Sequence, residues 1–173
     1  VAGDGDRFGY SVSIDENIAV VGAPYHDLAS IEDAGAAYVY ERVEGTWYYR
    51  AKLIASNAAA QDRFGESVFV SGDTVVVGAP DRDIGSNVDA GIAYVYEKSL
   101  SGWSDATETA QLSASDNAGG DAFGTSVCIT SDAIIIGAPL DDDGSSDNVG
   151  SAYIFSKPGE HWNTATETGK LEA

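Results

Sequence analysis

The side chains in this sequence that suggest chemistry are carboxylates, and they gather in loops. The densest group lies between Asp141 and Asp147, where Gly144 allows a sharp turn. Clustered carboxylate, hydroxyl and carbonyl oxygens suit Ca²⁺, which takes about 6 to 8 oxygen ligands at flexible angles. The sequence therefore predicts a calcium site in this loop and a second candidate in an earlier loop. The expected ligands are Asp141, Asp143, Ser145 and Asp147 in the first site and Asp81, Asp83 and Asp89 in the second.

A metal-free alternative is open for the same loops. Asp, Asn, Gly and Ser are also ordinary turn formers, because they tolerate unusual backbone angles and hydrogen-bond locally, and a solvated acidic loop needs no cation. A related carboxylate recurs two residues before a Phe-Gly pair, as Asp6, Asp62 and Asp121. For these three the sequence favours a structural role, in which each carboxylate accepts backbone N–H bonds.

The acidic loops recur because the whole chain repeats. Phe-Gly occurs at residues 8–9, 64–65 and 123–124, in steps of 56 and 59 residues. The triplet Gly-Ala-Pro at 22–24, 78–80 and 137–139 follows the same two steps, as does an Ala-Tyr strand at 37–38, 93–94 and 152–153. Concordant steps of this kind are typical of repeat architectures. We expect one domain over residues 1–173, with repeats at approximately 1–54, 55–113 and 114–173.

Each repeat reads as four short β-strands without helical periodicity. The first strand alternates after Phe-Gly, and a tight turn leads to a β-branched run such as Val75–Val77, which is typical of a strand buried on both faces. The third strand alternates aromatic and aliphatic residues, and the fourth ends in Lys52-Leu53 or its counterparts. Such units, repeated at almost 60 residues, predict an all-β stack of four-stranded antiparallel sheets, as in the blades of a β-propeller.

This topology also predicts where the carboxylates lie. Connections in a four-stranded meander alternate between the two ends of the sheet, so the loop after the second strand and the link after the fourth emerge on one face. More than half of the 28 acidic residues belong to these segments: Asp4, Asp6, Asp27, Glu32, Asp33, Asp62, Asp81, Asp83, Asp89, Asp116, Asp121, Asp141, Asp142, Asp143 and Asp147.

The order Phe-Gly, strand, Gly-Ala-Pro and a Gly-x-Ala-Tyr-Val-Tyr strand resembles the FG-GAP repeat, in three copies that cover essentially the whole chain. Proteins with this repeat, integrin α-subunits among them, form seven-bladed propellers that act in adhesion and ligand binding. The resemblance implies part of a larger six- or seven-bladed propeller in an extracellular or cell-surface protein. Integrin-type repeats often carry a calcium loop, Asp-x-Asp-x-Asp-Gly, between Phe-Gly and Gly-Ala-Pro. Here that interval is only a tight turn, so those sites are not carried over.

Composition narrows the class of partner. The 28 acidic residues against 9 Lys plus Arg give a formal charge of −19, which repels phosphate backbones and argues against nucleic acid. No stretch approaches the roughly 20 apolar residues of a membrane span, so we expect no membrane insertion. The single Cys128 cannot close an intrachain disulfide, and its apolar strand predicts that it is buried.

Three functions are open at this stage. The first is a binding module whose acidic face engages a protein or glycan ligand; the second is a scaffold repeat of a surface layer, filament or appendage; the third is a hydrolase. We expect no enzyme, because His26 and His161 fall at unrelated repeat positions and no catalytic motif is present. The recurrence of Trp47, Trp103 and Trp162 at one repeat position favours packing over sugar binding.

Three blades are too few for a closed propeller. Rings of this type need about 4 to 8 blades, and an open array leaves sheet faces exposed at its ends. We therefore expect further FG-GAP repeats in the same parent chain, or a homo-oligomer, to complete the ring.

Overall fold

The computed structural model describes residues 2–142, 144 and 146–172, and within these ranges the chain forms strands, turns and loops without a helix. The predicted all-β class is therefore confirmed. Two of the predicted metal ligands, Asp143 and Ser145, lie outside the described residues. In the described part of the chain we find no helix long and apolar enough to cross a membrane.

The strands form three antiparallel meanders, one per repeat. We call them blades 1, 2 and 3. Blade 1 has the order β1-β2-β3-β4, blade 2 the order β5-β6-β7-β8 and blade 3 the order β9-β10-β11-β13. Their bounds are Val12–Asp15, Ile18–Ala23, Ala36–Val43 and Thr46–Leu53 for β1 to β4; Ser67–Ser71, Thr74–Ala79, Ile92–Glu97 and Ala110–Ser113 for β5 to β8; and Ser126–Ile129, Ala133–Ala138, Ser151–Ser156 and Gly169–Glu172 for β9, β10, β11 and β13.

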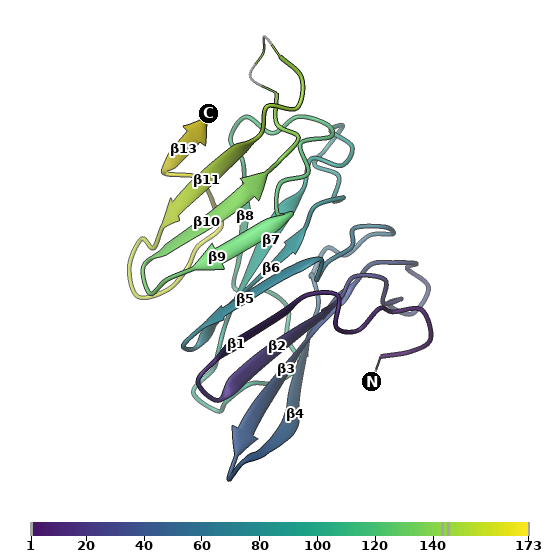
Figure 1. The fold of residues 1–173 in the computed structure, drawn as a ribbon, viewed down its shortest axis with the longest axis vertical. Coiled ribbons are helices and arrows are strands. Elements are labelled where there is room, and N and C mark those ends of the chain that lie inside the picture. The colour runs from purple at the N-terminus through teal and green to yellow at the C-terminus, as the bar shows by residue number, and fades with distance from the viewer. Residues whose placement is uncertain (1, 143, 145, 173) are drawn as a thin grey trace.

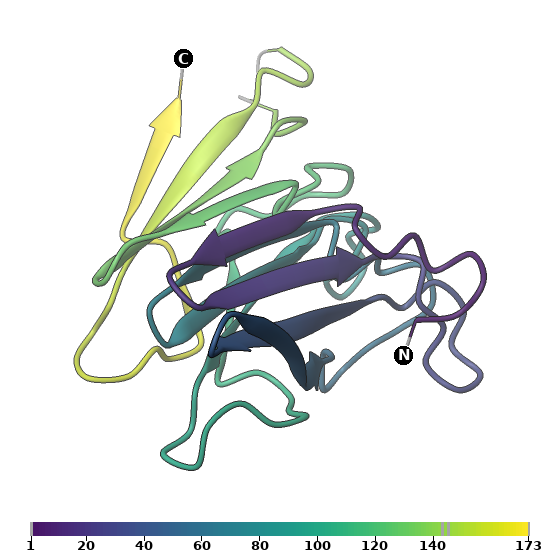
Figure 2. The ribbon, with the colours of Figure 1, turned by 60° about the horizontal axis from the view of Figure 1, so that its bottom comes forward.

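The blades stack face to face around a common inner edge. Strands β1 and β5 are adjacent, as are β5 and β9, and the three run side by side in Figure 1. The sheets fan apart toward their outer strands, as Figure 2 shows for β4 and β13. This is the arrangement expected of neighbouring propeller blades, in which each sheet buries both faces against its neighbours.

Two apolar clusters fill the spaces between the blades. The first lies between blades 1 and 2 and contains Val20, Leu53 and Phe64, and the second lies between blades 2 and 3 and contains Val76, Leu112 and Phe123. The run Val75–Val77 is fully buried, with alternate side chains in the two clusters, as its β-branched sequence predicts. The hydrophobic effect thus acts across the blade junctions, and each junction ties two repeats together.

The Phe-Gly pair of one repeat packs against two glycines of the repeat before it. Phe64 forms a parallel bridge with Gly35, which precedes the third strand, and Phe123 forms the same bridge with Gly91. The carbonyl oxygen of Gly65 lies where a side chain on Gly22 would be, 2.0 Å from the ideal Cβ position. This close backbone approach explains why the sequence keeps glycine there.

A further contact between blades was not expected from the sequence. The connections 98–109 and 157–168 each extend back over the outer strand of the preceding blade, and we call them arms. In the second arm, strand β12 (Ala165–Thr166) pairs in parallel with β8. Glu108 and Glu167 anchor the arms, since their carboxylates accept hydrogen bonds from the N–H and Oγ of Ser56 and Ser115 at 2.6 to 2.9 Å. Blade 1 has instead a tight hairpin between β3 and β4.

The arms also explain two of the three tryptophans. Trp162 is buried in the cluster between blades 2 and 3, and Trp103 packs at the edge of the cluster between blades 1 and 2. The packing role is therefore confirmed for both. Trp47, in the blade without an arm, is 39% exposed and lies beside the guanidinium of Arg42.

The prediction for Cys128 is wrong. Its side chain is exposed. The corresponding residue of blade 2, Phe69, packs against the cluster shared with blade 3. Cys128 points in the same direction from the last blade, where no described residue covers the sheet, so an apolar strand does not bury it.

Candidate functional site

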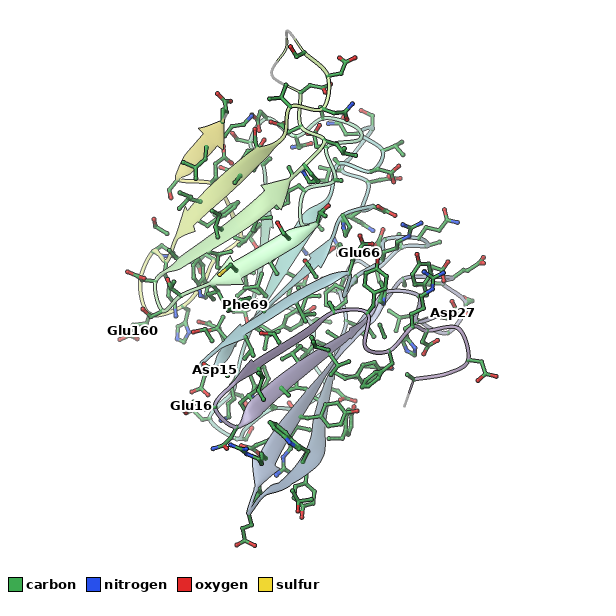
Figure 3. All side chains as sticks on the ribbon, viewed as in Figure 1. Asp15, Glu16, Asp27, Glu66, Phe69 and Glu160 are labelled. Atoms are coloured by element: carbon green, nitrogen blue, oxygen red, sulfur yellow. The ribbon has the colours of Figure 1, made fainter. Side chains whose placement is uncertain are left out.

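The candidate site is the end of the blades that carries the loops after β2, β6 and β10, together with the links that precede each Phe-Gly. We call this surface the loop face; it comprises the described residues of 2–7, 24–35, 54–63, 80–91, 113–122 and 139–150. Asp27 marks it in Figure 3, and Asp15, Glu16 and Glu160 mark the opposite end of the sheets. Backbone bonds join the segments, since Gln61 donates to Glu32 and Gly120 donates to Val88. The loops of successive blades therefore form one surface, as the meander topology predicts.

The first exposed aspartate of each loop holds the loop closed. Asp27, Asp83 and Asp142 each accept the backbone N–H six residues later, at 2.7 to 3.0 Å. The donors are Asp33, Asp89 and Asn148, and all three have left-handed backbone angles, with φ near 50°. The carbonyls of Asp33 and Asp89 accept a bond from the link of the next repeat. The loops of blades 1 and 2 are thus closed turns that also contribute to the blade junctions.

The predicted capping role of the aspartates before Phe-Gly is confirmed. Asp6, Asp62 and Asp121 are buried, and each accepts a backbone N–H three residues earlier at 2.6 to 2.7 Å. Two of them also contact a basic side chain: Asp6 lies 2.6 Å from His26 and Asp62 lies 2.9 Å from Arg82.

Blade 3 departs from this pattern. In the third repeat, Asp141 occupies the position that His26 and Arg82 occupy in the first and second repeats. Burial raises the pKa of Asp121, and the nearby Asp141 and Asp142 raise it further. Among the described residues, no basic side chain pairs with Asp121 as His26 and Arg82 pair with its counterparts. Two acidic groups face one another where the other repeats pair an acid with a base.

Lys170 supplies the compensating charge for Asp141. Its ammonium lies 2.9 Å from Asp141 and 2.7 Å from Asp116, and the hydroxyls of Ser151 and Tyr153 also donate to Asp141. Burial lowers the pKa of Lys170, but the hydrogen bonds to both aspartates outweigh it and raise the pKa overall. Asp141 is therefore held inside the blade, whereas Asp147 of the same predicted site is exposed. A cation at Asp141 has to compete with an ammonium group.

The second predicted site is more accessible. Asp83 and Asp89 are exposed and joined by the loop-closing bond, while Asp81 lies 3.0 Å from the guanidinium of Arg63. Burial raises the pKa of Asp81; Arg63 lowers it and the neighbouring Asp89 raises it. These three carboxylates share one neighbourhood, although in the described ranges no three or more His, Cys, Asp or Glu side chains are grouped closely enough to hold a metal ion.

Two basic residues on the loop face were not singled out in the sequence. The guanidinium groups of Arg7 and Arg63 both lie over the ring of Tyr25, at 3.9 and 5.4 Å from its centre. The signal available in the sequence was their position directly before the first two of the three Phe-Gly motifs. They interrupt the acidic surface at the junction of blades 1 and 2.

Comparison with known proteins agrees with this architecture. The family profile described as FG-GAP repeat matches residues 2–40, 47–96 and 106–155. Integrin alpha-6 of Gallus gallus is 35% identical over 127 residues, which cover 69% of this chain and 12% of that protein. The chain thus spans a small part of the length of this relative. With three profile matches over most of its length and three corresponding blades, the chain belongs to the FG-GAP repeat family.

Proposed function

We propose that this chain is a non-catalytic binding module of the adhesion type, located outside the cell or at its surface, and that its loop face engages a basic region of a protein partner. The observation that carries the proposal is the shared acidic surface made by loops of successive blades. Exposed carboxylates on it include Asp27, Glu32, Asp83 and Asp89. The similarity to an integrin α-subunit supports the adhesion class.

Two features make the loop face suitable for recognition. The loops are closed by their own side-chain bonds, so a partner would meet pre-formed turns and little conformational entropy would be lost on binding. A net charge of −19 attracts basic surfaces and accelerates encounter. A glycan ligand is a second candidate, but the tryptophans that would stack on sugar rings lie in the arms and hairpin away from this face.

We also propose that calcium binds weakly at the loop face. Asp83 and Asp89, with Asp81, are the better candidates, because Asp141 of the other predicted site is already paired with Lys170. The loop of the other predicted site keeps Asp143, Ser145 and Asp147 as candidate calcium ligands. Bound calcium would reduce the repulsion between the carboxylates and would stabilise the folded chain by mass action.

Melting curves at matched ionic strength test the calcium proposal. We expect a higher midpoint in calcium than in magnesium or chelator, since magnesium demands a stricter octahedral site. The double variant Asp83→Asn and Asp89→Asn should lose the calcium-dependent part of the shift, while Asp15→Asn at the opposite end of the blades should keep it. Equal midpoints in all three conditions would mean that the loops are metal-free turns.

A peptide array tests the binding proposal. The chain is applied to immobilised peptides of equal length that are basic, neutral or acidic. We expect retention on the basic peptides, several-fold weaker for a variant with Asp27, Asp83 and Asp89 changed to Asn. A control with Asp15, Glu16 and Glu160 changed to their amides removes the same charge from the opposite end and should bind normally. Equal losses in both variants would show that only net charge matters, and no retention at all would contradict the proposal.

The larger assembly is part of the same proposal. We propose that residues 1–173, with repeats at about 1–54, 55–113 and 114–173, are one segment of a ring of six or seven blades that further repeats complete. A scaffold repeat of a surface layer, filament or appendage is the second candidate function, favoured by the apolar packing that joins each blade to the next.

A further inference from the structure

Two arginines gather around one tyrosine where the loops of blades 1 and 2 meet. The guanidinium carbons of Arg7 and Arg63 lie 3.9 and 5.4 Å from the centre of the Tyr25 ring. Arg7 and Tyr25 belong to the first repeat, whereas Arg63 directly precedes the Phe-Gly pair of the second. We call these three side chains the arginine–tyrosine cluster. In a chain with 28 acidic and 9 basic residues, it brings two positive charges together on an otherwise acidic surface.

The fold itself does not require these arginines. Ala122 occupies the same position in the third repeat, and the backbone of all three residues is left-handed, with φ between 52° and 55°. Each of the three carbonyls accepts the N–H three residues later, so an alanine makes the same turn as an arginine. The position of Tyr25 is likewise held by Asp81 in the second repeat. The junction between blades 2 and 3 therefore forms without arginine and tyrosine at these two positions, and their side chains are available for another role.

The guanidinium groups keep hydrogen-bond donors for a ligand. A guanidinium over an aromatic ring uses its face for that contact, whereas its N–H donors lie in its plane. The ion pair of Arg63 with Asp81 joins Nε to the carboxylate at 3.0 Å, which leaves the terminal nitrogens to further acceptors. Burial and Asp81 raise the pKa of Glu66, and Arg63 lowers it, so the charge of Arg63 acts on two carboxylates. Arg63 is thus the more strongly held group, and Arg7, which is exposed, is the more available one.

The cluster is accessible where blades lie on both sides of it. Arg63 sits at the junction of blades 1 and 2, and its side chain is nevertheless 40% exposed. Tyr25, at the same junction, is half-buried. Arg7 occupies the equivalent position one repeat earlier, so a neighbouring blade on its other side would leave it open toward the loop face in the same way.

These properties suit a carboxylate ligand. A planar guanidinium matches a carboxylate, to which it donates two parallel N–H bonds. The surrounding Asp27, Glu32 and Asp83 are exposed and repel a molecule with many negative charges, such as a nucleic acid or a sulfated glycan. A single carboxylate inside a basic segment is not excluded in this way, because the segment as a whole is attracted to the loop face.

We propose that the arginine–tyrosine cluster binds one carboxylate of the protein partner, on an Asp or Glu side chain that lies within the partner's basic region. The basic side chains of that region contact the loop carboxylates, and the acidic side chain accepts N–H bonds from Arg7 and Arg63. This inference rests on the proposed function of the loop face and narrows the partner to a segment that carries both charges. The cluster makes the charge pattern of the partner, and not only its net charge, a condition for tight binding.

Paired peptides test this proposal. Each pair is one short lysine-rich sequence in which a single position is either Glu or Gln, and that position is moved along the peptide from pair to pair. We expect the parent chain to bind the Glu peptide several-fold more tightly than the Gln peptide at a restricted set of positions, although the Glu peptide is less basic. Arg7→Gln and Arg63→Gln should lose this preference and still bind the Gln peptides. Arg42 also lies over a ring, that of Trp47 in the β3–β4 hairpin, and Arg42→Gln should keep the preference.

An acetate titration separates this inference from the proposed function. Acetate replaces chloride at constant ionic strength while the Nε–H signals of the arginines are followed by NMR. We expect saturable shifts at Arg7 and Arg63 and none at Arg42. If no peptide is retained, these shifts would support the carboxylate site and contradict the function proposed for the loop face. Equal binding of the Glu and Gln peptides at every position, or equal acetate shifts at all three arginines, would overturn the inference and leave the attraction of basic peptides to the loop face unaffected.

Discussion

At the scale of single residues, the glycine of Gly-Ala-Pro has a different cost of substitution in each repeat. Gly78 faces the backbone carbonyl of Gly124, which cannot move without shifting blade 3, whereas Gly137 faces the Ser126 hydroxyl, which can rotate away. The same residue in the same motif is therefore constrained by its neighbour and not by its own backbone, since neither has a left-handed angle.

We expect Gly78→Ala to lower the free energy of unfolding by roughly 3 kcal/mol and Gly137→Ala by no more than about 1 kcal/mol, because overpacking against backbone costs more than against a mobile side chain. Gly78→Val should be worse still. Thermal melting at low protein concentration measures the difference, and Asp81→Asn serves as a loop control. Equal effects of the two alanine substitutions would show that the glycines are not set by the blade junction.

A second pair of residues isolates one hydrogen bond. The hydroxyl of Tyr94 donates to Asn57 at 2.8 Å, whereas the buried hydroxyl of Tyr38 has no partner in the described part of the chain. Burial, with Asp6 close by, raises the pKa of Tyr38 to about 12, so the group is a neutral, unpaired hydroxyl at physiological pH. The repeat position of Asn57 is occupied by Val1 in the first repeat, which offers no side-chain acceptor.

We expect Tyr38→Phe to be neutral or stabilising and Tyr94→Phe to cost about 1 kcal/mol, because only the second change breaks a bond and leaves an amide unpaired. Denaturant unfolding of the two variants measures both. A loss in Tyr38→Phe as large as that in Tyr94→Phe would show that the Tyr38 hydroxyl is bonded in solution.

The sequence predicted some of these residue roles and not others. The sequence favoured a capping role for Asp6, Asp62 and Asp121, because they recur at one repeat position and short polar residues often accept backbone N–H bonds in loops. The pairing of Asp141 with Lys170 was not evident from the sequence, because it depends on how blade 3 folds. Asp141 follows β10 and Lys170 lies in β13, and no repeat motif relates the two positions. The acidic run from Asp141 to Asp147 predicts a ligand set by its composition, although the first carboxylate, Asp141, is buried in the blade.

At the scale of elements, the arms show what repeat patterns omit. Four strands per repeat are predicted from the alternation of apolar and polar residues and from β-branched runs, because these patterns indicate which faces of a strand are buried. The arm of blade 3 contains a strand of two residues that pairs with another blade, and so short a segment has no period to detect. The extra length of the connections in the second and third repeats, compared with the first, was the available signal.

The first arm should make stability depend on pH. Burial raises the pKa of Glu108, but hydrogen bonds from Ser56 and Gln111 outweigh burial and lower the pKa overall. A carboxyl with a lowered pKa in the folded state contributes stability that is present above its unfolded pKa and is lost as the pH falls through the folded pKa. Glu108 therefore stabilises the contact between blades 1 and 2 at neutral pH and not in strong acid.

We expect Glu108→Gln to melt below the parent chain at neutral pH and to converge with it as the pH falls below the carboxyl range, because both side chains are then neutral. Glu160→Gln, at an exposed position on the same end of the blades as Asp15, should match the parent chain at every pH. A difference for Glu108→Gln that is independent of pH would indicate lost packing and not a lost charge.

At the scale of the whole molecule, the contact between neighbouring blades decides which apolar side chains are buried and which are exposed. It buries Val76, Phe64 and Phe123 where two blades meet, and it leaves Phe8, Cys128 and Leu171 exposed where a blade has only one neighbour. The sequence predicted the blades from their repeats, but the exposure of Cys128 depends on which faces are covered, and a strand pattern contains no such information.

The loop face is the other whole-molecule feature, because it exists only where loops from successive blades meet. Its acidic character was evident from sequence, since meander topology sends every second connection to one end. Which carboxylates are available was not evident, because loop-closing bonds and ion pairs engage Asp27, Asp62 and Asp81 in ways that only the fold decides.

The most direct test of the account is a residue-resolved NMR titration of the chain, first with calcium chloride and then with a basic peptide retained on the array. We predict that amide shifts concentrate in residues 24–35, 80–91 and 139–150 and in the links before Phe-Gly. The turns at 15–17, 71–73 and 130–132, at the opposite end of the blades, should remain unchanged. Shifts confined to those opposite turns, or spread evenly over the chain, would contradict the assignment of the loop face as the binding surface.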